Sequence, residues 1–163
     1  MGTVSANALF PADGHDHAAC MTAAQLRAQT ALQVAGLRMT VLRAKVLEEV
    51  SASHAAIGAY DILDRIAGKG RRLAPISVYR ALDALVTAGV VHRLESRNAY
   101  FTCQQPHDTR RSYLVLICSA CGRVAEAPAG RVLEAVEAVV RAVDFTLENA
   151  MVEVSGRCKP CAQ

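Results

Sequence analysis

Apolar residues recur at intervals of three and four along the first half of the chain, a spacing typical of helices with one buried face. The first such segment, 23–36, follows a capping-box pattern made by Thr22 and Gln25. The second, 41–50, follows Thr40, whose hydroxyl can cap the first turn. The pattern therefore predicts two helices, and the residues before Thr22 are expected to form a flexible tail.

Two more helices and a hairpin are predicted next. Residues 59–70 are amphipathic and end in glycines, and residues 77–89 run from Ser77, the predicted N-cap residue, to Gly89. Residues 90–103 alternate around the turn-like ESRN segment, which predicts a β-hairpin. Helices followed by a hairpin indicate a winged helix-turn-helix. Its last helix should direct Val78, Leu82, Leu85 and Val86 to the core and Tyr79, Arg80, Asp83 and Thr87 to the other side.

The second half of the chain has a different pattern. Residues 112–128 are strand-like, Pro128 and Gly130 interrupt them, and residues 146–163 return to extended structure. Between these strands lies a helical stripe of Val132, Leu133, Val136, Val139, Val140 and Val143. A β-β-α-β unit of this size is marginal alone, so we expect a cross-link, a partner chain or both.

The predicted fold class is α+β, with an N-terminal winged helix followed by a small α/β domain. The predicted divisions are a tail over 1–21, a winged-helix domain over 22–103, a hinge over 104–111 and a second domain over 112–163. The winged-helix segment has 11 basic and 6 acidic residues, whereas the second domain with the hinge has 7 of each. The excess positive charge therefore lies where a nucleic-acid surface would need it.

Composition and the absence of certain motifs argue against a disordered protein, a membrane protein and several classes of enzyme. The 163 residues are 52% apolar, which is enough for a folded core. Because no stretch approaches the roughly 20 apolar residues of a membrane helix, we predict a cytoplasmic protein without a membrane partner. No Ser-His-Asp arrangement, phosphate loop or pair of acid-base carboxylates stands out, so we predict a protein that is not an enzyme.

Four of the six cysteines form two C-x-x-C pairs, Cys118 with Cys121 and Cys158 with Cys161, separated by 36 residues. Two such pairs can supply the four thiolates of a tetrahedral Zn²⁺ site. A site closed by four thiolates has no open position, so this zinc would be structural. The alternative is a thiol oxidoreductase, in which Cys118 and Cys121 cycle through a disulfide. That chemistry usually places the pair at a helix N-terminus, whereas these pairs lie in strands and turns.

The chain resembles the ferric uptake regulator superfamily of metal-dependent repressors, and within it the zinc uptake regulator branch. The resemblance rests on GLRMTVLRAKVLEEV, GAYDIL, PISVYRALDALVTAGVVHRLES, LICSACGRVAE and CKPC, in this order, and covers residues from about 22 to 163. It implies a homodimer whose winged helices bind a double-stranded DNA operator and whose C-terminal domains dimerise.

The resemblance also implies which residues contact DNA. The fourth helix would lie in the major groove, with Arg80 contacting a base and Tyr79 reaching a phosphate or a thymine methyl group. Ser77, in the same segment, is also predicted to contact DNA, and Tyr60 matches another family position near the DNA. The alternative for each tyrosine is packing in the core.

A regulatory zinc site is implied by the same resemblance. Its ligands would be His92, Cys103, His107 and Glu126, giving one structural and one regulatory Zn²⁺ per protomer. A thiolate in the ligand set favours zinc over iron or manganese. Each residue also has a simpler interpretation, as a buried thiol, a surface carboxylate or a strand residue, and the relatives often have more histidines near His107 than this chain has.

The resulting hypothesis is a zinc-responsive repressor of zinc-uptake genes. The alternatives are a regulator of the same superfamily that responds to iron, manganese or peroxide, and the thiol oxidoreductase. Outside the predicted sites, His15, His17 and Cys20 are possible metal ligands, but we expect them to lie in a mobile tail, and His54 is interpreted as a loop residue.

Overall fold

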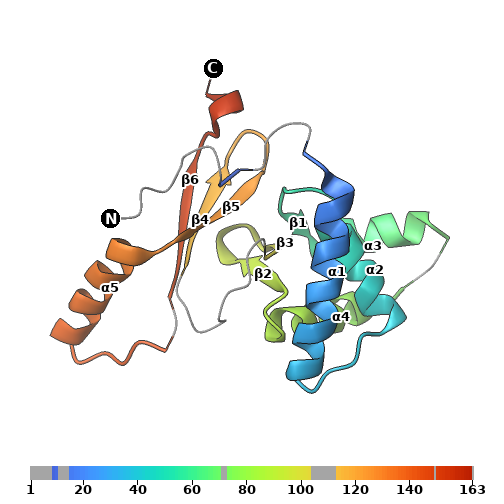
Figure 1. The fold of residues 1–163 in the computed structure, drawn as a ribbon, viewed down its shortest axis with the longest axis horizontal. Helices are drawn as coiled ribbons and strands as arrows, with labels where there is room; N and C mark the ends of the chain where they lie inside the picture. Colours follow the sequence, from blue (N-terminus) through green and yellow to red (C-terminus); the bar gives the residue numbers. More distant parts are fainter. Residues whose placement is uncertain (1–8, 11–14, 71–72, 104–112, 149, 163) are drawn as a thin grey trace. The chain divides into compact units, whose positions relative to one another are not determined.

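The computed structural model describes residues 9–10, 15–70, 73–103, 113–148 and 150–162 (Figure 1). The chain divides into two compact units, one built from Pro11–Gln104 and the other from Met1–Phe10 together with Gln105–Gln163. Within the described part of the chain, no helix combines the length and the apolar character needed to cross a bilayer.

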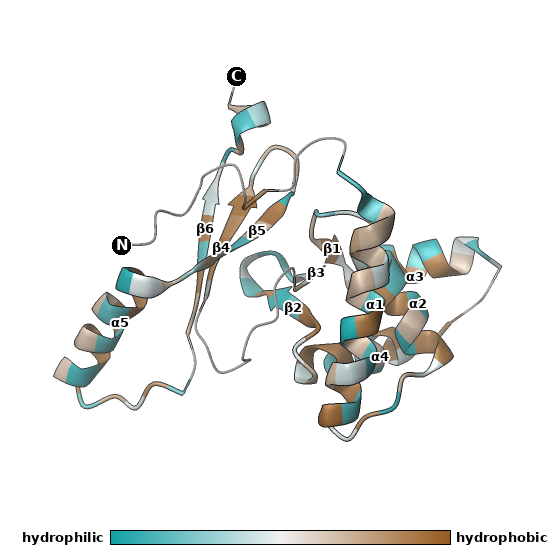
Figure 2. Cartoon of the chain, viewed as in Figure 1, coloured by the Kyte–Doolittle hydropathy of each residue, from teal (hydrophilic) through white to brown (hydrophobic). Residues whose placement is uncertain are grey.

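The first unit packs four helices, α1 His17–Val34, α2 Val41–Ser51, α3 Ala59–Gly68 and α4 Pro75–Thr87, around one core. Figure 2 shows apolar residues along these helices. The largest side chains that are completely or almost completely buried in this core include Leu32, Leu47, Ile62, Ile66, Leu82 and Leu85. The spacing of apolar residues thus predicts all four helices correctly.

A small antiparallel sheet completes the first unit. Its strands β1 Ile57–Gly58, β2 Val91–Leu94 and β3 Ala99–Thr102 are ordered β1-β3-β2. The β2–β3 hairpin is the predicted wing, and its turn ends at Asn98, whose φ of 45° suits the short polar side chain of asparagine. The prediction omits β1, because two residues are too short to show alternation.

Three local predictions are wrong. The helix α1 begins at His17, within the predicted tail, because Asp16 Oδ1 accepts a hydrogen bond from the Ala19 N–H. Thr22 is therefore an internal helix residue and not a cap. The helix α4 begins at Pro75, since proline suits a first turn that needs no N–H donor, so Ser77 lies inside the helix. Val86 is 37% exposed rather than in the core.

The second unit has the predicted β-β-α-β order, with β4 Tyr113–Cys118, β5 Val124–Pro128, α5 Gly130–Ala142 and β6 Met151–Gly156. Strand β4 is central, antiparallel to β5 and parallel to β6. A parallel pair needs a crossover connection, and α5 provides it. Because β4 and β6 run in the same direction, the residues after each strand meet at the same end of the sheet.

Candidate metal centres and nucleic-acid interface

The first cysteine pair lies at the end of β4. Cys118 is the last residue of the strand, and a tight turn follows in which the Gly122 N–H donates to the Cys118 carbonyl at 2.9 Å. Gly122 has a φ of 73°, a conformation that glycine adopts without steric cost. The Cys118 N–H in turn donates to the Arg123 carbonyl at 2.9 Å. This turn presents both Cys118 and Cys121 on one side of the backbone.

The second pair follows β6. Strand pairing sets Cys118 opposite Gly156, and the Ser119 N–H donates to the Gly156 carbonyl at 2.8 Å. Two residues later, Cys158 begins a single turn in which the Cys161 N–H donates to the Cys158 carbonyl at 2.9 Å. The parallel register of β4 and β6 therefore brings two pairs that are distant in sequence to the same place.

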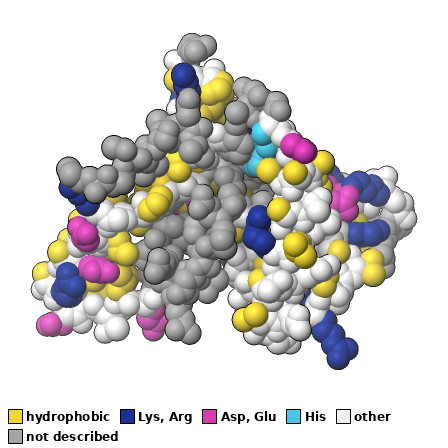
Figure 3. All heavy atoms as spheres, in the orientation of Figure 1, with side chains coloured by type: hydrophobic (Ala, Val, Ile, Leu, Met, Phe, Trp, Pro, Cys, Tyr) yellow, Lys and Arg dark blue, Asp and Glu magenta, His cyan; other side chains and the backbone are white. Residues whose placement is uncertain are grey.

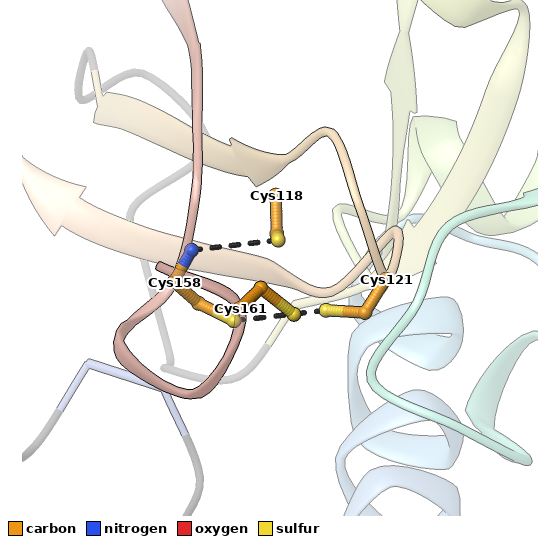
Figure 4. Close-up of side chains that lie close together, drawn as sticks. All are labelled: Cys118, Cys121, Cys158 and Cys161. Carbon is orange, nitrogen blue, oxygen red and sulfur yellow. Dashed lines mark hydrogen bonds between the residues drawn. The ribbon is translucent and has the colours of Figure 1, made fainter. Parts of the chain in front are cut away.

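The four sulfur atoms converge (Figure 4). All four Sγ atoms lie within 4.8 Å of one another, and those of Cys121 and Cys158 are 3.7 Å apart. Four sulfurs bound to one Zn²⁺ at about 2.3 Å are about 3.8 Å apart in a regular tetrahedron. A disulfide would need about 2 Å. The donor set and its spacing therefore fit a structural zinc ion held by Cys118, Cys121, Cys158 and Cys161.

The backbone prepares one of these thiols as a ligand. The Cys158 N–H donates to Cys118 Sγ at 3.4 Å, and this bond and the Cys121 N–H lower the pKa of Cys118 to about 5. Side-chain hydrogen bonding with Cys158 and Cys121 instead raises the pKa of Cys161 to about 12. Desolvation raises the pKa of Cys121. Without metal, Cys118 is thus a thiolate at neutral pH while Cys161 keeps its proton, so zinc binding must release protons and strengthens as the pH rises.

Two of the predicted regulatory ligands lie on the wing. His92 is on β2 opposite Phe101, with ring centroids 5.4 Å apart. Cys103 follows β3, and its N–H donates to the Val90 carbonyl at 3.0 Å. Arg27 also donates to the Cys103 carbonyl at 3.3 Å, which ties the end of the wing to α1. The hairpin register brings a ligand atom of His92 within 4.8 Å of the Cys103 sulfur.

The other two predicted ligands of the regulatory site, Glu126 and His107, follow the wing in the sequence. Glu126 lies on β5, paired with Val115 of β4 in the second unit. His107 lies outside the described residues. The structure therefore assembles the His92 and Cys103 half of the predicted site and gives Glu126 a defined strand position.

The predicted DNA-contacting residues share one part of the first unit. On α4, Val78 is buried in the core whereas Arg80 is exposed, as the helical pattern predicts. Tyr60 at the start of α3 is 65% exposed, and its ring lies edge-to-face with that of Tyr79 at 6.4 Å. Tyr79 is partly buried against the core, as the alternative of core packing expects, and its contact with DNA stays a prediction. Figure 3 shows lysine and arginine side chains distributed over the visible surface.

The structure brings together a third group of possible metal ligands, which the sequence did not predict as a site. The group consists of His15, His17 and His54, which all lie in the first unit. Each offers one ring nitrogen, and the three nitrogens lie within 4.8 Å of one another. The interpretation of the N-terminal histidines as a mobile tail is wrong for His17, which begins α1. The sequence does contain a signal, since Asp16 between two histidines can cap a helix, but nothing in it connects that segment to His54.

Comparison with known proteins places the chain in a family. The model of the ferric uptake regulator family matches residues 34–155, most of the chain. The chain belongs to the ferric uptake regulator family. Its membership agrees with the winged helix, the four-cysteine cluster and the β-β-α-β unit described above.

Several relatives of this ferric uptake regulator family member have names that refer to zinc. The chain is 34% identical over 127 residues to the zinc uptake regulation protein of Escherichia coli (strain K12), covering 78% of this chain and 74% of the relative. A zinc uptake regulator solved in complex with zinc and DNA has 32% identity and a TM-score of 0.77, covering 87% of this chain and 95% of that one. The holo form of XcZur has 34% identity and a TM-score of 0.76, covering 87% and 98%.

Proposed function

We propose that this protein is a zinc-responsive transcriptional repressor that binds palindromic operators as a homodimer and controls zinc-uptake genes. The observation that carries the proposal is the match over most of the chain to a zinc uptake regulator in complex with zinc and DNA. The exposed Arg80 on α4 and the four-cysteine cluster are the local features that such a regulator needs. The protein would therefore have a regulatory role and no catalytic one.

We propose one role for each of the predicted domains. The winged helix over 22–103 would bind DNA, the segment 112–163 would dimerise, and the residues 104–111 would act as the hinge. Each protomer would hold two Zn²⁺ ions. Cys118, Cys121, Cys158 and Cys161 would hold the structural ion, and His92, Cys103, His107 and Glu126 would hold the regulatory ion.

The regulatory site gives the metal response. His92 and Cys103 from the wing and Glu126 from β5 would hold the same ion, and so restrict the movement of the winged helix about the hinge. A thiolate among imidazoles and a carboxylate suits Zn²⁺ better than Fe²⁺ or Mn²⁺. Operator and zinc must then raise each other's affinity by the same factor, because their coupling free energy is reciprocal.

The apolar face of α5 supports dimerisation. No residue of α5 is buried, and Val139 is 66% exposed, with Val143 at 69% and Phe145 at 61% just beyond the helix. Figure 2 shows apolar bands along this helix. A contiguous apolar stripe exposed on a protein surface marks an interaction site. We propose that a second copy of the chain covers it.

Replacing Val139 by Asp should separate the dimer into monomers, because it places a charge in the proposed apolar interface. Sedimentation equilibrium of the zinc-loaded protein would measure the change, with the dimer dissociation constant rising by at least about 10-fold, or about 1.4 kcal/mol. The matched control is Glu134→Gln, an exposed polar position of the same helix. A V139D dimer as tight as the parent would exclude α5 from the interface.

Zinc-dependent operator binding tests the proposal directly. A palindromic fragment is first selected from random DNA with the zinc-loaded protein, and its binding is then followed by fluorescence anisotropy at a series of buffered free zinc concentrations. The proposal expects tight binding with zinc and loss of binding after mild chelation, while the dimer and its tightly held zinc persist. Binding driven by Fe²⁺ or Mn²⁺ but not by Zn²⁺ would favour the alternative regulators of this family.

Replacing Cys103 by Ser should weaken this response without unfolding the dimer. The free zinc concentration needed for half-maximal operator binding should rise by at least about 10-fold, the loss that even indirect partners of a metal ligand produce. Elemental analysis and sedimentation would show that the four-cysteine zinc and the dimer remain. A C103S protein with the parent's zinc response would remove Cys103 from the site.

The thiol oxidoreductase is the weaker alternative. A reactive C-x-x-C pair is typically placed at a helix N-terminus that lowers its pKa. Here Cys118 ends β4 and Cys121 lies in the turn after it, so neither is at a helix N-terminus. The low pKa of Cys118 comes mainly from the N–H of Cys158 in the other pair, which fits a four-cysteine site. Mass spectrometry after thiol trapping separates the two functions, since a zinc site releases four thiols together on chelation and a redox pair loses two hydrogens.

A further inference from the structure

We propose that His15, His17 and His54 form a third metal site that takes a divalent zinc ion. This site lies entirely within the first unit, apart from the four-cysteine cluster and from the proposed regulatory ligands. It does not depend on the proposed function. The three histidines are each partly exposed, so an ion could reach them.

The start of α1 positions two of the rings. Asp16 is the N-cap residue, with its carboxylate accepting the Ala19 N–H at 3.0 Å, and His17 is the first residue of the helix. Capping fixes the backbone on either side of Asp16. The rings of His15 and His17 are thereby held edge-to-face, with centroids 5.5 Å apart.

The third ring comes from a distant part of the sequence. His54 lies in the connection between α2, which ends at Ser51, and β1, which begins at Ile57. Its ring centroid is 4.6 Å from that of His15 and 4.9 Å from that of His17. Three imidazoles thus surround one point, each with a ring nitrogen within 4.8 Å of the others.

A simple pair of hydrogen-bonded histidines accounts for only part of this arrangement. The Nε2 atoms of His54 and His15 are 2.7 Å apart, which is the length of a hydrogen bond between the two rings. Both ring nitrogens of His17 are buried, and neither has a hydrogen-bond partner within the described residues. Buried polar atoms normally have a partner, and a metal ion at the centre of the three rings would supply one.

The ligand set indicates the chemical class of the ion. Neutral imidazole is a common ligand for zinc, and three histidines with a water molecule in the fourth position form a known zinc arrangement. Nitrogens bound to one Zn²⁺ at about 2.0–2.1 Å are about 3.3 Å apart, so His15 and His54 need to separate only slightly. Cys20, which is exposed on α1, lies outside the group of three nitrogens.

Such an ion would join the start of α1 to the connection before β1. That connection leads through β1 into α3, so the ion would link α1 to a segment that is distant in sequence. It should therefore stabilise the first unit and protect the first turn of α1 from opening, since a ligand that binds only the folded state stabilises it.

The test compares zinc content in untagged full-length protein and in the variant His17→Gln/His54→Gln. Both are dialysed against the same buffered free zinc concentration, and zinc is counted by elemental analysis. The variant should bind one equivalent less than the parent, and the single variant His54→Gln should bind that equivalent at least about 10-fold more weakly. Hydrogen exchange of the first turn of α1 should slow on zinc addition in the parent alone.

Two controls make the result decisive. Cys20→Ser removes the remaining possible ligand of the same segment and should keep the parent's zinc count. Co²⁺ added to the parent after removal of only the extra equivalent of zinc should give the weak visible bands of a nitrogen site without charge transfer from a thiolate. Equal zinc counts in parent and double variant, or a loss of the extra zinc in Cys20→Ser, would overturn the three-histidine site.

Discussion

Replacing Cys118 by Ser should release the structural zinc and unfold the unit built from Gln105–Gln163. The apparent binding free energy of a structural zinc is about 10–16 kcal/mol, which is as large as the entire stability of an ordinary domain, about 5–15 kcal/mol. Within one protomer little else holds this unit together, because α5 buries no residue and the buried apolar side chains of the sheet are few. Cys118 also accepts the Cys158 N–H, so its replacement removes a ligand and weakens one of the contacts between the two pairs.

Hydrogen exchange with mass spectrometry locates this unfolding. In C118S the amides of β4, β5 and β6 should exchange rapidly, while those of α2 and α4 remain protected by their own core. Elemental analysis should show the loss of at least one zinc per chain. Cys20→Ser is the matched control, because Cys20 is exposed and outside the cluster, and it should behave as the parent. Full protection of β4 in a C118S protein that has lost its zinc would show that the zinc is not needed for folding.

The elements that the sequence predicts correctly are those with strong local signals. Thr40 caps α2 as expected, with its hydroxyl accepting the Arg43 N–H at 3.2 Å, and the apolar stripe of α4 is buried at Val78, Leu82 and Leu85. The wing follows from alternation around its turn. In each case the residues that determine the element lie within a few positions of one another, so their pattern is visible without the fold.

The four-cysteine cluster was predictable for a different reason. The spacing within a C-x-x-C pair lets both thiolates bind one metal ion as soon as the pair forms a tight turn. The fold then only has to bring the two turns together. The parallel register that does so, with Cys118 opposite Gly156, is not visible in the sequence. Zinc chemistry therefore predicted a proximity that secondary-structure patterns could not.

The features that the sequence did not reveal depend on competition between signals or on distant contacts. Thr22 with Gln25 makes a capping box, but Asp16 caps the same helix earlier and adds the turn that begins at His17. At α4, Pro75 begins the helix before Ser77 can cap it. The approach of His54 to the start of α1 joins residues about forty positions apart, and only the packed structure shows it. The assignment of His92, Cys103, His107 and Glu126 to a regulatory site stays a prediction.

Replacing Arg80 by Ala should abolish selective operator binding. Arg80 is exposed on α4 next to Tyr79, whose ring is in contact range of Tyr60, so these three residues form one candidate DNA surface. A guanidinium that donates to both O6 and N7 of guanine contributes about 1–3 kcal/mol of discrimination. The two copies in the proposed dimer would contribute about 2–6 kcal/mol, which corresponds to roughly 30-fold or more in affinity.

Arg80→Lys distinguishes a base contact from a phosphate contact, because it keeps the charge and removes the fork. Anisotropy titrations with the selected operator and with a scrambled duplex, at several salt concentrations, measure both effects. If Arg80 contacts a base, both variants should lose the preference for the operator, and R80K should keep the parent's affinity for scrambled DNA. If R80A weakens both duplexes equally and lowers the salt dependence, Arg80 contacts the phosphate backbone and another residue determines the sequence.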